Sequence, residues 1–128
     1  MKKLTFITGI ILCLIVTACS KKDSPLPANQ KHTIKVTASA TADFAAVIST
    51  ADNLGVSPTV VKTVSVAAGT SFEFSTDAAS NSYVFLKLSS DTENNITYKI
   101  FDNGTVAQQE NGKEFISHST ETFQYQVQ

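Results

Sequence analysis

Apolar side chains recur at every second position through most of the chain from His32 onward. Ile34, Val36 and Ala38 alternate with polar residues, and six later segments within residues 44–127 repeat the pattern. Successive side chains of a strand point to opposite sides, so this alternation, rich in β-branched and aromatic residues, predicts strands with one buried face. No long helical period competes with it. Residues 41–51 leave an alternative open, because their alanines would also tolerate a helix.

Turn residues separate the alternating segments. Asn103-Gly104 and Asn111-Gly112 tolerate the positive φ that tight turns need, and Ala67-Ala68-Gly69-Thr70 predicts another hairpin. Seven or eight short strands with regular turns predict an all-β, antiparallel sandwich over residues 31–128. The 110 residues that follow position 18 of the 128-residue chain suit one such domain.

Residues 1–18 have the pattern of a bacterial lipoprotein signal peptide. Met1-Lys2-Lys3 is a short basic start, and residues 4–16 form an apolar run that is shorter than a membrane span needs. The lipobox Val16-Thr17-Ala18-Cys19 ends the segment. We therefore expect Cys19 to be lipidated, to become the first mature residue and to hold the protein at a membrane. Residues 19–30 are polar with two prolines and are expected to form a flexible tether.

The residues around Cys19 also bear on compartment and partners. Cys13 is lost with the signal, so lipidation of Cys19 leaves the domain without a disulfide or a thiolate site. In enterobacteria an aspartate directly after the lipidated cysteine favours retention in the inner membrane. Ser20 occupies that position here, so we expect the protein in the outer membrane, on its periplasmic face or at the cell surface. Eight lysines remain in the mature chain against eleven acidic residues, a net charge of −3. That balance argues against nucleic acid or an anionic membrane surface as the main partner.

No catalytic or metal-binding motif stands out. His32 and His118 lie far apart and outside metal-ligand spacings, and no Gly-x-Ser-x-Gly is present. An enzyme would need the fold to bring two carboxylates, or a histidine and a carboxylate, into one cleft. Residues 91–95 cluster oxygen ligands of the kind calcium prefers, but their spacing matches no EF-hand. We therefore predict no enzyme, no cofactor and no metal.

Aromatic residues form the candidate binding surface. By alternation, Tyr83 and Phe85 share one side of their strand with Lys87, and Phe101 shares a side of the next strand with Lys99. If the two strands are neighbours, the five side chains form an aromatic patch edged by lysines, which suits a protein or a glycan. The alternative is that these rings face a second sheet or lie under a loop, as most large aromatic side chains of small domains do.

Residues 58–112 resemble the soluble domain of MmpS-like proteins, which are small accessory partners of membrane transporters. The similar segments are Lys62-Thr63-Val64-Ser65-Val66-Ala67-Ala68-Gly69, the strand-forming residues 71–74, and Ile96-Thr97-Tyr98-Lys99-Ile100-Phe101-Asp102-Asn103-Gly104-Thr105-Val106. The resemblance implies an Ig-like β-sandwich with no catalytic residues to carry over. Small envelope lipoproteins of the Bacteroidota look similar. Unlike the mycobacterial relatives, this chain has a lipobox in place of a transmembrane anchor and no cysteine near Tyr98.

These observations predict a lipid-anchored lipoprotein of the bacterial cell envelope. Its sandwich would be a non-catalytic binding or accessory domain that supports an envelope or transport complex. The alternative is a surface glycan-binding or adhesive module in which Tyr83, Phe85 or Phe101 stacks on sugar rings.

Overall fold

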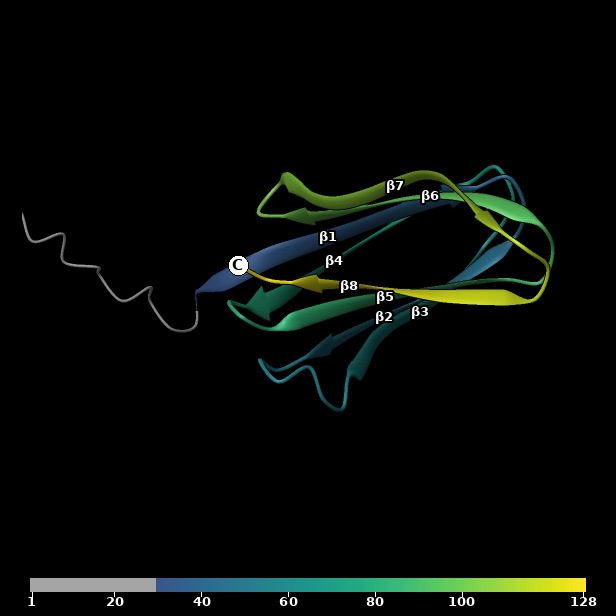
Figure 1. The fold of residues 1–128 in the computed structure, drawn as a ribbon. Coiled ribbons are helices and arrows are strands. Elements are labelled where there is room, and N and C mark those ends of the chain that lie inside the picture. Colours follow the sequence, from purple (N-terminus) through teal and green to yellow (C-terminus); the bar gives the residue numbers. More distant parts are fainter. Residues whose placement is uncertain (1–29) are drawn as a thin grey trace, which may run out of the picture.

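The computed structural model describes residues 30–128, which fold into two packed antiparallel sheets (Figure 1). The strands are β1 (Lys31–Ala40), β2 (Phe44–Ala51), β3 (Thr59–Val66), β4 (Ser71–Ala79), β5 (Tyr83–Ser90), β6 (Asn94–Asp102), β7 (Thr105–Phe115) and β8 (Ser119–Gln126). Sheet A has the order β4-β1-β6-β7 and sheet B the order β3-β2-β5-β8. The all-β antiparallel sandwich of seven or eight strands is confirmed. The predicted signal peptide, Cys19 and all of the tether except Gln30 lie outside the described residues.

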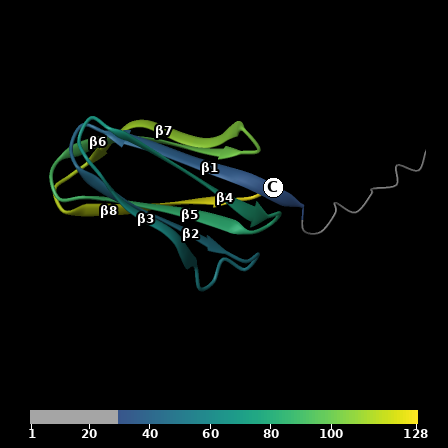
Figure 2. The same ribbon diagram turned by 180° about the vertical axis from the view of Figure 1, so that it is seen from behind.

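Only two connections stay within a sheet. The hairpins β2–β3 and β6–β7 do so, and every other connection between the eight strands crosses from one sheet to the other (Figures 1 and 2). The hairpin predicted at residues 67–70 was wrong, because that connection joins β3 of sheet B to β4 of sheet A. The crossings give the sandwich two distinct ends. Gln30, the C-terminus and the connections 52–58, 80–82 and 103–104 lie at one end, which we call the tether end. The connections 41–43, 67–70, 91–93 and 116–118 lie at the far end.

The core occupies the space between the two sheets and follows the predicted alternation. Its largest fully buried side chains are Ile34, Val36, Ile48, Val84, Leu86, Leu88, Ile96, Tyr98, Ile100 and Val127. Tyr98 packs its ring 4.4 Å from that of Phe123, centroid to centroid, and its hydroxyl accepts a 3.0 Å hydrogen bond from Gln108. Truncating one such buried aliphatic side chain to alanine typically costs about 2–5 kcal/mol of stability.

The alanine-rich segment 41–51 contains strand β2 and no helix. Phe44, Ala46 and Ile48 are buried at period two against the core, while the intervening residues are half-buried on the outer face. The sheet environment overrides the helix preference of alanine, because β2 pairs with β3 on one side and β5 on the other. Within residues 30–128 the structure contains no helix long and apolar enough to cross a membrane.

Candidate functional site

The five residues of the predicted binding surface divide between two opposite faces. Strand β5 belongs to sheet B and strand β6 to sheet A, so the two strands are not neighbours. Tyr83, Phe85 and Lys87 lie on the outer face of sheet B, and Lys99 and Phe101 lie on the outer face of sheet A. The single patch that required adjacent strands is therefore not assembled. None of the five side chains faces the opposing sheet, because the alternate residues of their strands, Val84, Leu86, Leu88, Tyr98 and Ile100, are the ones buried in the core.

Two ion pairs lie on the outer face of sheet A, between β1 and β4. Lys35 lies 3.5 Å from Glu73, and its Nζ is 4.7 Å from the centre of the Phe101 ring. Lys31 and Asp77 form a second pair at 2.8 Å. These exposed pairs contribute little to stability one by one, but they place opposite charges next to each other across the β1–β4 register. Phe101 is thus partly shielded by a charged neighbour of its own sheet.

The outer face of sheet B is almost free of charge. Cross-strand registers align Ser49, Phe85 and Gln124 in one row and Val47, Lys87 and Thr122 in the next. Hydroxyl, amide, aliphatic and aromatic side chains make up this face: Ala45, Val47, Ser49, Ala51, Val60, Thr63, Ser65, Tyr83, Phe85, Ser89, Thr120, Thr122, Gln124 and Gln126. Lys87 is the one charged side chain of this face within the described strands. We call this surface the neutral face.

Two aromatic rings lie on the neutral face, and one of them is partly covered. The ring centres of Tyr83 and Phe85 are 6.3 Å apart. The loop between β2 and β3 passes over Tyr83 so closely that a β-carbon at Gly55 would lie 3.2 Å from its Cδ2 atom. Gly55 also has φ +67°, which L side chains rarely adopt. Tyr83 therefore matches the alternative of a ring packed under a loop, whereas Phe85 is half-buried in the middle of the face.

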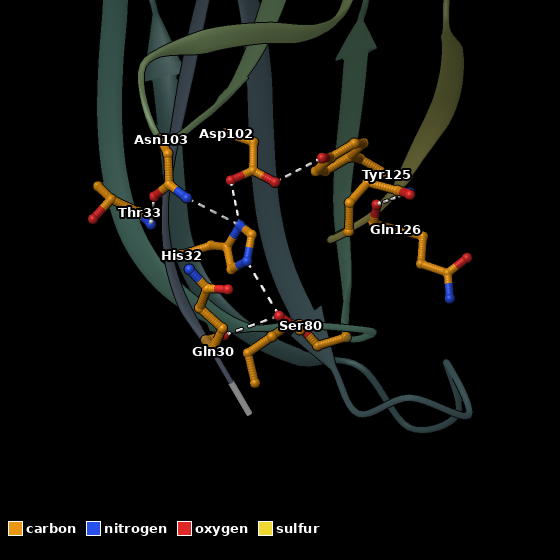
Figure 3. Close-up of polar contacts among 11 residues, drawn as sticks. Gln30, His32, Thr33, Ser80, Asp102, Asn103, Tyr125 and Gln126 are labelled. Atoms are coloured by element: carbon orange, nitrogen blue, oxygen red, sulfur yellow. Dashed lines mark hydrogen bonds and ion pairs between the residues drawn. The ribbon is translucent and has the colours of Figure 1, made fainter. Parts of the chain in front are cut away.

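A polar cluster that sequence reasoning missed lies at the tether end (Figure 3). Nδ1 of His32 is 2.6 Å from Oδ1 of Asp102, and the Tyr125 hydroxyl donates a 2.7 Å hydrogen bond to Oδ2 of the same carboxylate. Nε2 of His32 is 3.2 Å from Oγ of Ser80. Asn103 links the β6–β7 turn to β1, because its Oδ1 accepts a hydrogen bond from the Thr33 amide at 3.0 Å. The cluster joins β1, the β4–β5 turn, β6 and β8.

The hydrogen-bond partners of His32 and Tyr125 determine which atoms of this cluster carry protons. A carboxylate oxygen 2.6 Å from Nδ1 requires a proton between the two atoms, so His32 donates from Nδ1 to Asp102. Burial raises the pKa of Tyr125 to about 12, and its hydrogen bond to Asp102 and the negative charge of that carboxylate add to the rise. Tyr125 is consequently a proton donor at every physiological pH. Asp102 has both oxygens engaged.

Ser80, His32 and Asp102 are connected in the order of a hydrolase triad, but the surroundings of Ser80 do not match one. A nucleophilic serine needs free donors nearby to stabilise the oxyanion. Here the Ser80 amide donates to the Gln30 carbonyl, the Asn81 amide to Val127 and the Ser82 amide to Ala79. The Ser80 hydroxyl is itself 3.2 Å from the Gln30 carbonyl. The geometry favours a structural tie that holds the chain where it enters the sandwich.

One residue of the oxygen-rich segment 91–95 has a structural role. Asn94 is buried, and its Oδ1 accepts from the Ala42 amide at 2.9 Å while its Nδ2 donates to the Ala42 carbonyl at 3.0 Å. The side chain of Asn94 thereby fastens the β1–β2 connection to β6. No group of three or more histidine, cysteine, aspartate or glutamate side chains within residues 30–128 is arranged to hold a metal ion. His118 lies in the 116–118 connection, at the opposite end from His32.

Two open cavities lie at the far end. One of about 530 Å³ is bordered by Asp43, Ser65 and Thr92, and one of about 490 Å³ by Asn94, Glu114 and Phe115. Asp43 already accepts a hydrogen bond from the Ala68 amide at 2.8 Å. Neither cavity is lined by the histidine of the polar cluster or by a ring of the neutral face.

Comparison with known proteins adds no family to this picture. No protein-family model matches the chain, and no curated protein or solved structure matches it either. The resemblance to MmpS-like proteins stays a prediction from the segments that carry it.

Proposed function

We propose that this protein is a lipid-anchored lipoprotein of the cell envelope, held in the outer membrane through Cys19, and that its sandwich is a non-catalytic binding or accessory domain. Its partner in this proposal is a component of an envelope or transport complex. The binding surface is the neutral face of sheet B.

The contrast between the two outer faces supports this choice of surface. Two lysines on the outer face of sheet A are paired with acidic residues of the same sheet, Lys35 with Glu73 and Lys31 with Asp77, so a neutral partner that binds there would have to displace or cover these charges. The neutral face has one charged side chain and a half-buried aromatic ring at its centre. Binding surfaces between proteins are depleted in charge at their centre and enriched in aromatic residues. Phe85 is therefore the residue that we expect to contribute most to binding.

The polar cluster supports a domain without catalysis. The amides that could stabilise an oxyanion near Ser80 are all engaged by carbonyls. Replacing Ser80 with alanine should accordingly leave any binding by the neutral face unchanged.

A glycan is the second candidate partner, and the composition of the neutral face favours it over a charged ligand. Sugar rings stack on aromatic side chains, and their hydroxyls pair with amide and hydroxyl groups such as those of Gln124 and Thr122. Both lie in the same registers as Phe85 and Lys87. This candidate would be supported if the protein bound immobilised envelope polysaccharides on a glycan array, and if Phe85→Ala abolished that binding while Phe101→Ala kept it.

The anchor is tested by fractionating cells that express the full chain. Cys19→Ala should move the protein from the membrane to the soluble periplasmic fraction. Cys13→Ala is the matched control, because the proposal removes position 13 with the signal, and this variant should stay in the membrane. Retention of Cys19→Ala in the membrane would refute the anchor.

The binding face is tested by photo-crosslinking in intact cells. A photoreactive residue placed at position 85 should give a discrete adduct, whereas one at position 101 on the opposite face should not. Equal adducts from both positions, or none from either combined with an empty glycan array, would refute the neutral face as the binding surface.

A further inference from the structure

Exposed apolar side chains gather toward one end of the sandwich. Six large hydrophobic residues are exposed within residues 30–128: Leu54, Val56, Val60, Val61, Val106 and Ile116. The first two lie in the β2–β3 loop, the next two near the start of β3, and Val106 near the start of β7, all on the side of the tether end. Ile116 alone among these six lies at the far end. Single exposed apolar side chains are common on protein surfaces, but several of them at one end of a domain indicate a contact surface.

The β2–β3 loop carries Leu54 and Val56, the two most exposed of the five apolar residues at the tether end, and hydrogen bonds hold it in a defined turn. We call residues 52–58 the β2–β3 tip. The Gly55 amide donates to the Asp52 carbonyl at 3.0 Å, and the Leu54 amide donates to Oδ1 of Asp52 at 3.0 Å. Gly55 rests against the ring of Tyr83. Leu54 remains 73% exposed and Val56 59% exposed, so the turn presents both side chains to the surroundings.

The chain leaves the sandwich toward Cys19 at this same end. The Gln30 carbonyl accepts from the Ser80 amide at 2.8 Å, which fixes the point of departure beside the β4–β5 turn. Both ribbon views place the β2–β3 tip and the start of β1 at the same end of the domain (Figures 1 and 2). The twelve residues from Cys19 to Gln30 span about 40 Å at most, since an extended residue covers roughly 3.3–3.6 Å.

We infer that the β2–β3 tip docks into the apolar boundary of the membrane that holds the Cys19 lipid, an inference that rests on the anchor in the proposed function. The short tether confines the tip to the neighbourhood of the bilayer, which raises its effective concentration there. Two apolar side chains on a hydrogen-bonded turn can add apolar contact with the acyl-chain boundary to the hold of the Cys19 lipid. The domain would then present its far end outward and its neutral face sideways.

The charges of the tip specify the kind of lipid surface. Asp52 is the one ionisable side chain among residues 52–58, and the segment contains no lysine. The tip itself therefore has no positive charge with which to attract anionic headgroups. The contact should form on zwitterionic lipid and persist in high salt, unlike the binding of a basic patch.

The test uses the mature, lipidated chain reconstituted into phosphatidylcholine vesicles. Lipid occupies the Cys19 thiol, so Leu54→Cys introduces a single thiol for an environment-sensitive fluorophore. We expect a blue-shifted emission that nitroxide-labelled phospholipids quench, at both low and high salt. Ile116→Cys is the matched control, because Ile116 is 75% exposed at the far end, and its label should be neither shifted nor quenched.

A second measurement keeps the label off the tip. Thr105→Cys places the fluorophore in the exposed start of β7 at the tether end. Its quenching by nitroxide lipids should fall when Leu54→Ser and Val56→Ser are added, and should not change when Ile116→Ser is added instead.

The outcomes separate this inference from the anchor on which it rests. Co-sedimentation with vesicles together with selective quenching at position 54 supports docking. Co-sedimentation with equal or no quenching at positions 54 and 116 overturns docking and leaves the anchor standing. A shift at position 54 that nitroxide lipids do not quench points to a second copy or a protein on the tip and also overturns docking. Failure to co-sediment overturns the anchor and the inference with it.

Discussion

Nδ1 of His32 lies 2.6 Å from Oδ1 of Asp102, a contact that joins the start of β1 to the end of β6 across 70 positions of the chain. The two side chains are only 10% and 12% exposed. Tyr125 of sheet B holds the other carboxylate oxygen, so a single carboxylate ties the two sheets together at the tether end. Its removal should loosen the place where the chain enters the domain.

Asp102→Asn should therefore destabilise the fold. The amide group cannot accept from both His32 and Tyr125, and breaking a mostly buried pair in this way costs about 2–4 kcal/mol. Chemical denaturation provides the measurement. Asp77→Asn is the matched control, because its partner Lys31 is 73% exposed and the pair should contribute less than about 1 kcal/mol. Equal losses in the two variants would contradict the structural role of Asp102.

Tyr125→Phe should lose stability in a pH-dependent way. At neutral pH the variant lacks a hydrogen bond to a charged group, which contributes about 1.5–3 kcal/mol. The folded-state pKa of Tyr125 is raised from 10.0 to about 12, so the folded state holds this proton more tightly than the unfolded state does. The stabilisation is fully present below pH 10 and is lost as the pH rises through 12.

Urea unfolding of both proteins between pH 7 and pH 12 checks this prediction. The stability difference between wild type and Tyr125→Phe should stay constant up to pH 10 and shrink above it. The pKa of Tyr98 is also raised by burial, but both proteins contain Tyr98, so its effect cancels in the comparison. A difference that does not change across pH 10–12 would show that folding does not raise the pKa of Tyr125, and would contradict its burial beside Asp102.

Gly55→Ala should cost more stability than Gly69→Ala. Both glycines have a positive φ, +67° and +70°, so each substitution pays a similar conformational cost of about 1 kcal/mol. Only at position 55 does the new methyl group meet a ring, 3.2 Å from Tyr83, whereas no atom lies within 4 Å of a β-carbon at position 69. Thermal unfolding of the two variants separates crowding from backbone strain, and equal melting temperatures would argue against contact between the tip and Tyr83.

Asn94→Ala should loosen the far end of the sandwich. The variant leaves the Ala42 amide and carbonyl without their side-chain partner, at a cost of about 1–3 kcal/mol. Asn95→Ala is the control, since Asn95 is exposed and should tolerate the change within about 0.5 kcal/mol. Hydrogen exchange should increase at Ala42 in the first variant and stay unchanged in the second. Protection at Ala42 that survives Asn94→Ala would contradict the proposed role of this side chain.

Seven of the eight strands were predictable because alternation is a local property, whereas β7 was missed because its mostly exposed residues do not alternate in burial. A residue such as Leu86 or Ile100 must face the core if its neighbours on either side face water, whichever strand lies beside it. The segment 41–51 was ambiguous for the same reason, since alanine fits both a helix and a strand and only pairing with β3 and β5 decides between them. The Asn103-Gly104 turn was visible in advance, and Asn103 and Gly104 both adopt positive φ.

The candidate surface was predictable residue by residue but not as a unit. Alternation placed Phe85 and Phe101 away from the core, and the structure agrees for both. Whether they meet depends on which sheet receives β6, and the short 91–93 connection crosses to the other sheet. The polar cluster was out of reach for the same reason, because nothing local relates His32 to a carboxylate 70 residues away.

The sequence alone determined the period of most strands, the turns at Gly69 and Asn103-Gly104 and the expectation of an anchor at Cys19, since these depend on residues close together in the chain. The turn predicted at Asn111-Gly112 was wrong: these residues lie within β7, where the register with β6 shifts and Gly112 has a positive φ. Tertiary structure decided which strands are neighbours. It thereby separated Phe85 from Phe101, joined His32 to Asp102, and gathered Leu54 and Val56 at the end where the chain departs toward Cys19. Strand order is set by the packing of whole faces against each other, a collective free energy that no short segment of the chain contains.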